Sequence, residues 1–168
     1  MSNLTDISDV IIIGSGPAGL SAAIYVVRAG LSVNVIEKEF MGTGQIADSS
    51  KVDNYLGIPA ISGYDLGESF REHALSLGVT IEDNNVTRLT PVDDIWELEL
   101  SDGSTKKARC VIYAAGCSHK KLQAENEEQY TGKGISYCAV CDGAFYKDKD
   151  VAVVGGGDTA LSDALYLS

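Results

Sequence analysis

Two cysteines, Cys138 and Cys141, stand three positions apart and are followed at once by Asp142. A C-x-x-C spacing lets two thiols close a small disulfide ring, and a nearby positive charge or dipole favours one thiolate. A carboxyl group beside a thiolate can carry its proton. The segment therefore predicts thiol–disulfide redox chemistry, with Cys138, Cys141 and Asp142 as the candidate catalytic residues.

A zinc site is the alternative for a chain with four cysteines. The other two, Cys110 and Cys117, lack the C-x₂₋₄-C spacing of a structural zinc knuckle. Cys110 also opens an apolar run that is expected to be a buried strand. We therefore interpret Cys110 and Cys117 as small core or rim residues and predict no metal site.

A glycine-rich turn near the start of the chain matches the G-x-G-x-x-G pattern. The first glycine allows a tight turn, the second lets the backbone approach a pyrophosphate, and the third lets a helix pack close to a strand. Glu37 follows about 20 residues later, where a carboxylate binds ribose hydroxyls. The turn predicts a dinucleotide site, and its residues are Gly14, Ser15, Gly16, Pro17, Ala18 and Gly19.

A second glycine turn, residues 155–160, repeats the pattern with alanine in the third glycine position. On the usual interpretation, two such turns mean two nucleotide sites. The acidic partner of the second turn would lie beyond Ser168. A lone strand and helix cannot bury both faces of a parallel sheet, so we expect the natural sequence to continue.

Strands and helices must hold these motifs in place. Residues 10–13 form a short β-branched run, typical of a buried parallel strand before the first turn. A helix is predicted over residues 20–29, capped by Gly30, and a second strand at Val33–Glu37. This β-α-β order implies a right-handed crossover and a parallel sheet.

Further elements precede the cysteine pair. Residues 66–77 carry apolar side chains on one helical face, and residues 79–82 follow as a strand. Ile95–Leu100 alternates apolar with acidic residues, and the Asp-Gly pair at 102–103 supplies a turn, which predicts a hairpin or meander. Residues 111–115 are predicted as another buried strand.

The pattern changes after Gly116, where a polar linker leads to the cysteines. Residues 151–154 are then predicted as a strand and Asp158–Leu167 as a helix around the second turn. We therefore predict an α/β protein with a Rossmann-like domain of parallel sheet plus β-meander at 1–117. The start of a second Rossmann-like domain, with the cysteine pair, would occupy 118–168.

The composition narrows the partners. The sequence has 13 basic and 24 acidic side chains, for a net charge of −11. Such a surface repels nucleic acid and anionic lipid, and we interpret the acidic cluster at 125–128 as a solvated face. No apolar run approaches the ~18 residues that span a bilayer, and residues 1–9 do not resemble a signal or transit peptide. We expect a cytoplasmic protein that binds neither nucleic acid nor membranes.

With these motifs, the chain resembles bacterial-type (low-molecular-weight) thioredoxin reductase along nearly its whole length. The segment at 136–145 places C-x-x-C-Asp-Gly between two dinucleotide motifs, an arrangement specific to this family. The other matching segments are residues 13–23, 44–46, 52–57, 114–116 and 151–168.

The resemblance implies FAD in the first domain and NADPH in the second. Around FAD, besides the glycine turn itself, it assigns Glu37, Lys38, Gly44, Gln45, Ile46, Asn54, Val86, Ala114, Ala115 and Gly116. The residues that it assigns to the start of the NADPH site are Gly155, Gly157, Asp158 and Thr159.

The resemblance also implies separate roles for the catalytic residues. Cys141 would be the sulfur next to the flavin, Cys138 would attack the disulfide of thioredoxin, and Asp142 would donate a proton. Electrons would pass from NADPH through FAD to the Cys138–Cys141 disulfide, and on to thioredoxin or a thioredoxin-like protein. The family resemblance implies a homodimer.

Two other functions stay open at this point. One is a related flavoprotein disulfide reductase that takes electrons from ferredoxin or serves another protein partner. The other is a non-catalytic nucleotide-binding fragment. We expect the 168-residue chain by itself to fold in part and to be inactive with NADPH and thioredoxin.

Overall fold

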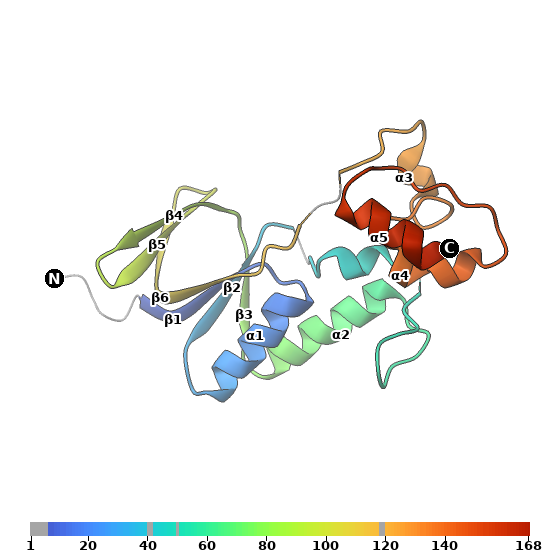
Figure 1. The fold of residues 1–168 in the computed structure, drawn as a ribbon. Helices are drawn as coiled ribbons and strands as arrows, with labels where there is room; N and C mark the ends of the chain where they lie inside the picture. The colour runs from blue at the N-terminus through green and yellow to red at the C-terminus, as the bar shows by residue number, and fades with distance from the viewer. Residues whose placement is uncertain (1–6, 40–41, 50, 118–119) are drawn as a thin grey trace. The chain divides into compact units, whose positions relative to one another are not determined.

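The computed structural model describes residues 7–39, 42–49, 51–117 and 120–168 (Figure 1). The chain divides into two compact units, Met1–Cys117 and Ser118–Ser168, here called unit 1 and unit 2. Each unit has its own elements, and each is described separately below.

Unit 1 is built on one six-stranded sheet with the order β3-β2-β1-β6-β5-β4. Neighbours among β3, β2, β1 and β6 run parallel, whereas β6, β5 and β4 pair antiparallel. The strands are β1 (Ile7–Ile13), β2 (Val33–Glu37), β3 (Thr80–Asp83), β4 (Val86–Val92), β5 (Ile95–Leu100) and β6 (Thr105–Tyr113).

Strand β6 joins the two parts of this sheet. The sequence predicted a meander and, separately, a buried strand at residues 111–115. In the structure the last strand of the meander and residues 111–113 are one strand, β6, which pairs antiparallel with β5 through its first half and parallel with β1 along most of its length. The meander is therefore continuous with the parallel strands instead of forming a layer of its own. Residues 114 and 115 lie beyond the strand, and the predicted burial of 111–115 is wrong, since all five are half-buried or exposed.

Helices α1 (Pro17–Arg28) and α2 (Gly63–Ser76) lie side by side against the sheet (Figure 1). Proline stands in the first turn of α1, where its missing N–H has no intrahelical partner to lose. The hydroxyl of Ser62 caps α2 by accepting the N–H of Asp65 at 3.0 Å. Just beyond the two helices, Gly30 and Gly78 adopt left-handed φ angles of 76° and 89°, close to the predicted helix ends.

The core of unit 1 has two layers, one on each face of the sheet. The helix-side cluster comprises Val10, Ile12, Leu20, Ala23, Val35, Ala74 and Val79. The opposite cluster comprises Ile11, Ile36, Leu98, Leu100 and Ala108. Successive residues of β1, such as Ile11 and Ile12, enter opposite clusters because side chains alternate along a strand. Burial on both faces explains why β1 has a continuous apolar run.

Unit 2 contains only helical elements among its described residues apart from an isolated bridge between Thr131 and Ile135. They are α3 (Glu127–Tyr130), α4 (Ala139–Asp142), the 3₁₀ helix η3 (Gly143–Tyr146) and α5 (Asp158–Leu167). Helix α5 confirms the predicted bounds. Its last residues, Tyr166 and Leu167, lie against Gly143, where an added Cβ would come within 3.3 Å and 3.1 Å of their side-chain atoms.

The predicted strand at residues 151–154 is wrong. All four residues are exposed and none belongs to a strand. A parallel strand is stable only when neighbouring strands take up its backbone N–H and C=O groups. No strand among the described residues of unit 2 stands beside this segment.

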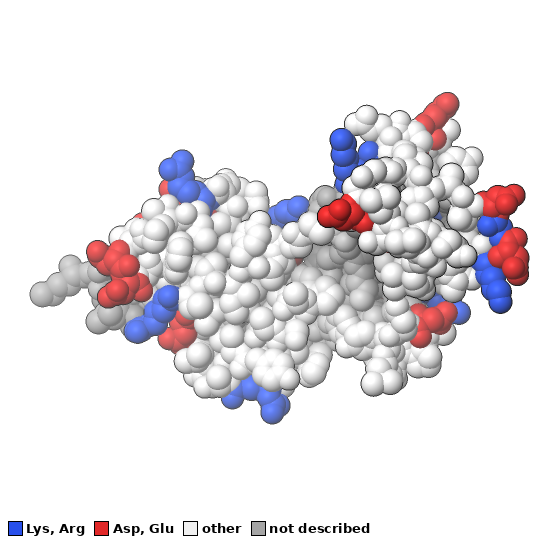
Figure 2. All heavy atoms as spheres, viewed as in Figure 1, with Lys and Arg blue, Asp and Glu red and all other residues white. Residues whose placement is uncertain are grey.

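The described part of the chain contains no helix with the length and apolar character needed to cross a bilayer. On the face drawn in Figure 2, lysine and arginine side chains are scattered and interspersed with acidic ones.

Candidate functional site

The first glycine turn is shaped by contacts that exclude side chains. Gly14 has a φ of 103°, and a Cβ built on it would lie 2.4 Å from the carbonyl oxygen of Ala114. A Cβ on Gly19 would lie 1.9 Å from the carbonyl oxygen of Gly14. Only glycine fits at either position. The turn after β1, the start of α1 and the segment after β6 therefore meet at one point.

Glu37, at the end of β2, is buried against this turn. Its carboxylate accepts the N–H of Ser15 at 2.7 Å, the hydroxyl of Ser15 at 2.9 Å and the N–H of Glu39 at 3.0 Å. Burial acts to raise the pKa of Glu37, but the hydrogen bonds from Ser15 and Glu39 outweigh it, so the pKa lies below its ordinary value. The carboxylate is thus held ionised at the turn.

A second loop, residues 42–44, packs against the first glycine turn. The Ser15 hydroxyl also approaches the carbonyl oxygen of Gly42, and a Cβ on Gly44 would lie 3.1 Å from the Cα of Gly16. Thr43 is buried, and its side chain occupies the space over Gly67 of α2. Sequence reasoning missed Thr43, because nothing in its spacing shows that it packs on a helix about 20 residues away.

Most residues assigned to FAD by resemblance gather around this turn. The side-chain amide of Gln45 donates to the carbonyl of Cys117, which joins the 44–46 segment to the end of unit 1. The N–H of Asn84 donates to the carbonyl of Glu37 at 2.8 Å, which places the start of β4, and so Val86, at the same edge. Lys38 is exposed beside Glu39. Among the described residues, no hydrogen bond links Asn54 to the turn.

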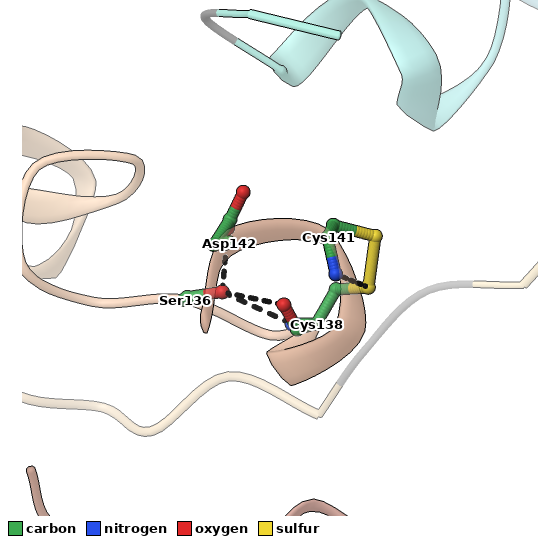
Figure 3. The surroundings of a disulfide bond; sticks show 4 residues. All are labelled: Ser136, Cys138, Cys141 and Asp142. Carbon is green, nitrogen blue, oxygen red and sulfur yellow. Dashed lines mark hydrogen bonds between the residues drawn. A yellow bond between two sulfur atoms is a disulfide. The ribbon is translucent and has the colours of Figure 1, made fainter. Parts of the chain in front are cut away.

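The cysteine pair of unit 2 forms a disulfide with the two Cα atoms 5.3 Å apart (Figure 3). Cys138 precedes α4, and its sulfur accepts the N–H of Cys141 at 3.2 Å. The N–H of Asp142 donates to the carbonyl of Cys138 at 3.1 Å. The predicted catalytic residues therefore share one helical turn, with Cys141 exposed and Cys138 half-buried.

Ser136 is a residue of this loop that sequence reasoning missed. Its hydroxyl donates to a carboxylate oxygen of Asp142 at 2.6 Å and accepts the N–H of Cys138 at 3.1 Å (Figure 3). The same hydroxyl lies 3.3 Å from the carbonyl of Cys138. The position of a serine two residues before a cysteine does not predict its hydrogen bonds, because its partners come close only when the loop has folded.

A buried carboxylate, Glu127, organises the segment before the cysteines. It accepts the N–H groups of Leu122, Gln123 and Ala124 at 3.3, 2.6 and 3.3 Å, and the hydroxyl of Tyr137. The hydrogen bond from Tyr137 is the main reason that the pKa of Glu127 lies below its ordinary value, and the same bond raises the pKa of Tyr137. The interpretation of residues 125–128 as a solvated face is wrong for Glu127, which is 7% exposed.

Cys110 and Cys117 are free and exposed. Cys110 lies within β6 and pairs with Val10 of β1, but its side chain is exposed, so its assignment to the core is wrong. In the ranges that the structure describes, no group of three or more His, Cys, Asp or Glu residues is arranged to hold a metal ion.

The second glycine turn is packed less closely than the first: a Cβ on Gly155 would lie 3.1 Å from the Cβ of Ala160, and one on Gly157 would meet nothing within 4 Å. Gly155 has a φ of 140°, Gly157 is the N-cap of α5, and Asp158 and Thr159 form its first turn. All four are exposed. Helix α5 has ten residues, and its N-cap is Gly157. No side chain caps the first N–H groups of this helix with a hydrogen bond.

Comparison with known proteins gives one family match and many relatives. The family model described as pyridine nucleotide-disulphide oxidoreductase matches residues 8–168. Thioredoxin reductase of Mycoplasma genitalium is 43% identical over 162 residues, which are 96% of this chain and 51% of that protein. Thioredoxin reductase of Bacillus subtilis is 44% identical over 164 residues, 96% of this chain and 51% of that protein.

A solved structure gives the same result. Thioredoxin reductase from Streptococcus pyogenes matches with a TM-score of 0.90 at 40% identity, over 96% of this chain and 52% of that chain. The chain spans about half the length of the curated relatives it matches.

Proposed function

Since this chain belongs to the pyridine nucleotide-disulphide oxidoreductase family, we propose that it binds FAD and carries the redox-active disulfide of an NADPH-dependent thioredoxin-disulfide reductase. The likeness to thioredoxin reductases over 96% of the chain supports this activity. The single observation that carries the proposal is the loop in which the Cys138–Cys141 disulfide and the carboxylate of Asp142 stand together. A cleavable sulfur–sulfur bond and a group that can move a proton are the two parts that such a reaction needs.

The residues of the first glycine turn fit a dinucleotide. The N-cap of helix α1, Gly16, has no side chain, and the first helical residues, Pro17 and Ala18, are exposed. Helix N-terminal N–H groups and the helix dipole favour the negative charge of a pyrophosphate at such a position. Glu37 accepts hydrogen bonds from Ser15, from Glu39 and from the backbone of Lys38, and these keep its carboxylate ionised at the turn. In this proposal that carboxylate is the acceptor for a ribose hydroxyl.

When bound, FAD would supply hydride transfer from a nicotinamide, which neither a thiol nor a carboxylate can accept. In this proposal Gly14, Ser15 and Ala18 would hold the pyrophosphate, Glu37 would bind the adenosine ribose, and Gly44 to Ile46 would contact the flavin part. At the second turn, Gly155, Gly157, Asp158 and Thr159 would hold the pyrophosphate of NADPH.

The thiol chemistry follows from the loop. Two electrons and two protons convert the Cys138–Cys141 disulfide into two thiols. The thiolate of Cys138 then attacks the disulfide of thioredoxin and forms a mixed disulfide. Cys141 attacks that bond, thioredoxin leaves as a dithiol, and the loop disulfide is restored. The carboxylate of Asp142 can take the proton from a loop thiol and pass it to the leaving sulfur.

The free, exposed thiols of Cys110 and Cys117 support a reducing compartment, since oxidising compartments convert such thiols to disulfides. We therefore propose a cytoplasmic protein, acting as a homodimer.

The exchange step can be tested on the chain as it is. Protein reduced with dithiothreitol and freed of reductant is mixed with oxidised thioredoxin, and new thioredoxin thiols are counted. Every protein in the test, the parent included, carries Cys110→Ser and Cys117→Ser, because these exposed thiols would also react. We expect transfer by this parent and none by its Cys138→Ser variant. Cys141→Ser should instead accumulate a mixed disulfide through Cys138, because the second sulfur is missing.

The outcome also assigns the sulfurs. A mixed disulfide that accumulates in Cys138→Ser and not in Cys141→Ser would reverse the roles of the two cysteines, and the greater exposure of Cys141 makes that comparison necessary. No transfer by the parent would contradict the proposed function.

A further inference from the structure

We propose that Ser136 is a positioning residue that keeps the redox loop in shape when the Cys138–Cys141 disulfide opens. The inference rests on the proposed function, since it concerns the same disulfide. It assigns a role to a residue that carries no reactive group of its own.

The hydroxyl of Ser136 connects the two ends of the loop. A hydroxyl has one hydrogen to donate. The shortest contact, 2.6 Å, is to the carboxylate of Asp142, so the hydrogen goes there. The oxygen accepts the N–H of Cys138 at 3.1 Å. One side chain thus links the residue that starts the turn to the residue that ends it, and the bond to Asp142 is charge-assisted.

The other bonds of the loop lie inside its turn. They run from the N–H of Cys141 to the sulfur of Cys138, and from the N–H of Asp142 to the carbonyl of Cys138. Helix α4 has only four residues, and a single helical turn is unstable by itself in water. Once the sulfur–sulfur bond breaks, these internal bonds depend on the turn staying closed. The Ser136 bonds hold Asp142 and Cys138 from outside the turn.

The consequence is a shift in the disulfide equilibrium. A loop held in shape loses less conformational entropy when its two thiols form a disulfide. Ser136 therefore favours the disulfide over the dithiol. Removal of its hydroxyl should make the pair easier to reduce, which means a less negative reduction potential.

The equilibrium can be measured against glutathione. Two glutathione thiols give up two electrons and two protons and join as glutathione disulfide, while the Cys138–Cys141 bond breaks and takes up the same electrons and protons as two thiols. Because Cys110 and Cys117 are exposed and would also react, all variants carry Cys110→Ser and Cys117→Ser. The oxidised fraction is read after acid quenching and alkylation, by mass.

We expect Ser136→Ala to change the equilibrium constant about tenfold in favour of the dithiol, which for a two-electron couple is about 30 mV. Ser136→Thr, which keeps a hydroxyl, should stay within about twofold of the parent on the same scale. Ser104→Ala is the matched control, because it removes a serine–aspartate hydrogen bond of 2.7 Å, to Asp102, in unit 1. It should leave the potential unchanged. Circular dichroism of each variant checks folding.

A double variant tests the mechanism. In an Asp142→Ala background the Ser136→Ala change should have a clearly smaller effect, because its charged partner is already gone. An unchanged or more negative potential in Ser136→Ala, no rescue by threonine, or full additivity with Asp142→Ala would each overturn the positioning role. A parent pair that glutathione neither reduces nor reoxidises would overturn the proposed redox function itself.

Discussion

Glu37 has two tasks at one site. Its carboxylate is bound by Ser15 and Glu39 of the protein, and in the proposed function it also binds the ribose of FAD. The first task fixes the glycine turn before any nucleotide is present. The second then costs little reorganisation, because the acceptor is already aimed and ionised.

Glu37→Ala should therefore weaken FAD binding by about 1.5–3 kcal/mol for each charge-assisted hydrogen bond lost. The measurement is titration of the flavin-free chain with FAD, followed by quenching of flavin fluorescence. Glu39→Ala is the matched control, since Glu39 is exposed and its hydrogen bonds to Glu37 and Gly42 are made by its backbone, which the substitution keeps.

Ser15→Ala separates the two tasks, because it removes a hydroxyl bond to Glu37 without removing the carboxylate. If Ser15→Ala weakens FAD binding as much as Glu37→Ala does, the whole loss of affinity comes from the glycine turn and not from a ribose contact. Undiminished FAD affinity in Glu37→Ala would count against the ribose contact.

The role of the turn glycines could be predicted from the sequence, whereas the hydrogen-bond partners of Ser136 and Glu127 could not. Gly14 and Gly19 are required by backbone geometry, which a local pattern encodes. Ser136 and Glu127 are defined by the partners that folding brings to them. The sequence offers several equivalent serines and glutamates, so composition made Glu127 a surface residue although it is buried.

At the scale of elements, the segment from Leu122 to Tyr137 is built around Glu127. Three backbone N–H groups and one phenol converge on one carboxylate, and the next residue after Tyr137 is Cys138. These side-chain hydrogen bonds connect the redox loop to α3. They matter because the described residues of unit 2 form only one isolated β-bridge and no strand.

This arrangement predicts an acid-sensitive segment. The pKa of Glu127 is lowered on folding from its ordinary value of 4.5, first by the hydrogen bond from Tyr137. A lowered folded-state pKa contributes stability that is present above pH 4.5 and is lost as the pH falls through the folded value. Hydrogen-exchange protection factors of the Leu122, Gln123 and Ala124 amides should therefore fall as the pH is lowered through the folded-state pKa of Glu127, which lies below 4.5.

Glu127→Gln is the comparison variant, because its amide has one acceptor oxygen in place of two. It should show low protection of the same amides already near neutral pH, with little further loss in acid. The same protection in the parent above and well below pH 4.5 would show that ionised Glu127 does not stabilise the segment.

The parallel strands show where element prediction succeeds. β1 and β2 were predicted because β-branched runs with glycine turns identify strands that are covered on both faces. The same signal at residues 151–154 gave a wrong result, since an apolar run becomes a strand only beside a partner. β4, with most of its residues exposed, carried too little apolar signal to be recognised.

At the scale of the whole molecule, the second glycine turn differs from the first in having no strand before it. A working site of this type forms where neighbouring parallel strands end. The segment before the second glycine turn is unpaired and exposed, and α5 exposes Leu161 and Leu165 at 59% and 79%. The turn therefore lacks the sheet that would fix it.

The 168-residue chain should accordingly show no steady-state turnover with NADPH, FAD and thioredoxin. The readout is NADPH oxidation by absorbance, with the dithiothreitol-reduced chain and thioredoxin as the positive control for the exchange step. Turnover at ordinary enzyme rates, about 1–10³ per second, would overturn this expectation.

The pairing of β1 with β6 also affects how the protein is made. Ile7 of β1 stands opposite Lys107 of β6, so the central contact of unit 1 joins residues about 100 positions apart. At a synthesis rate of about 5–20 residues per second, β1 leaves the ribosome roughly 5–20 seconds before its partner. During that interval the edge of β1 that later pairs with β6 is unpaired, and its apolar side chains are not yet covered. Folding of unit 1 should therefore be slow and should finish only after β6 has left the ribosome.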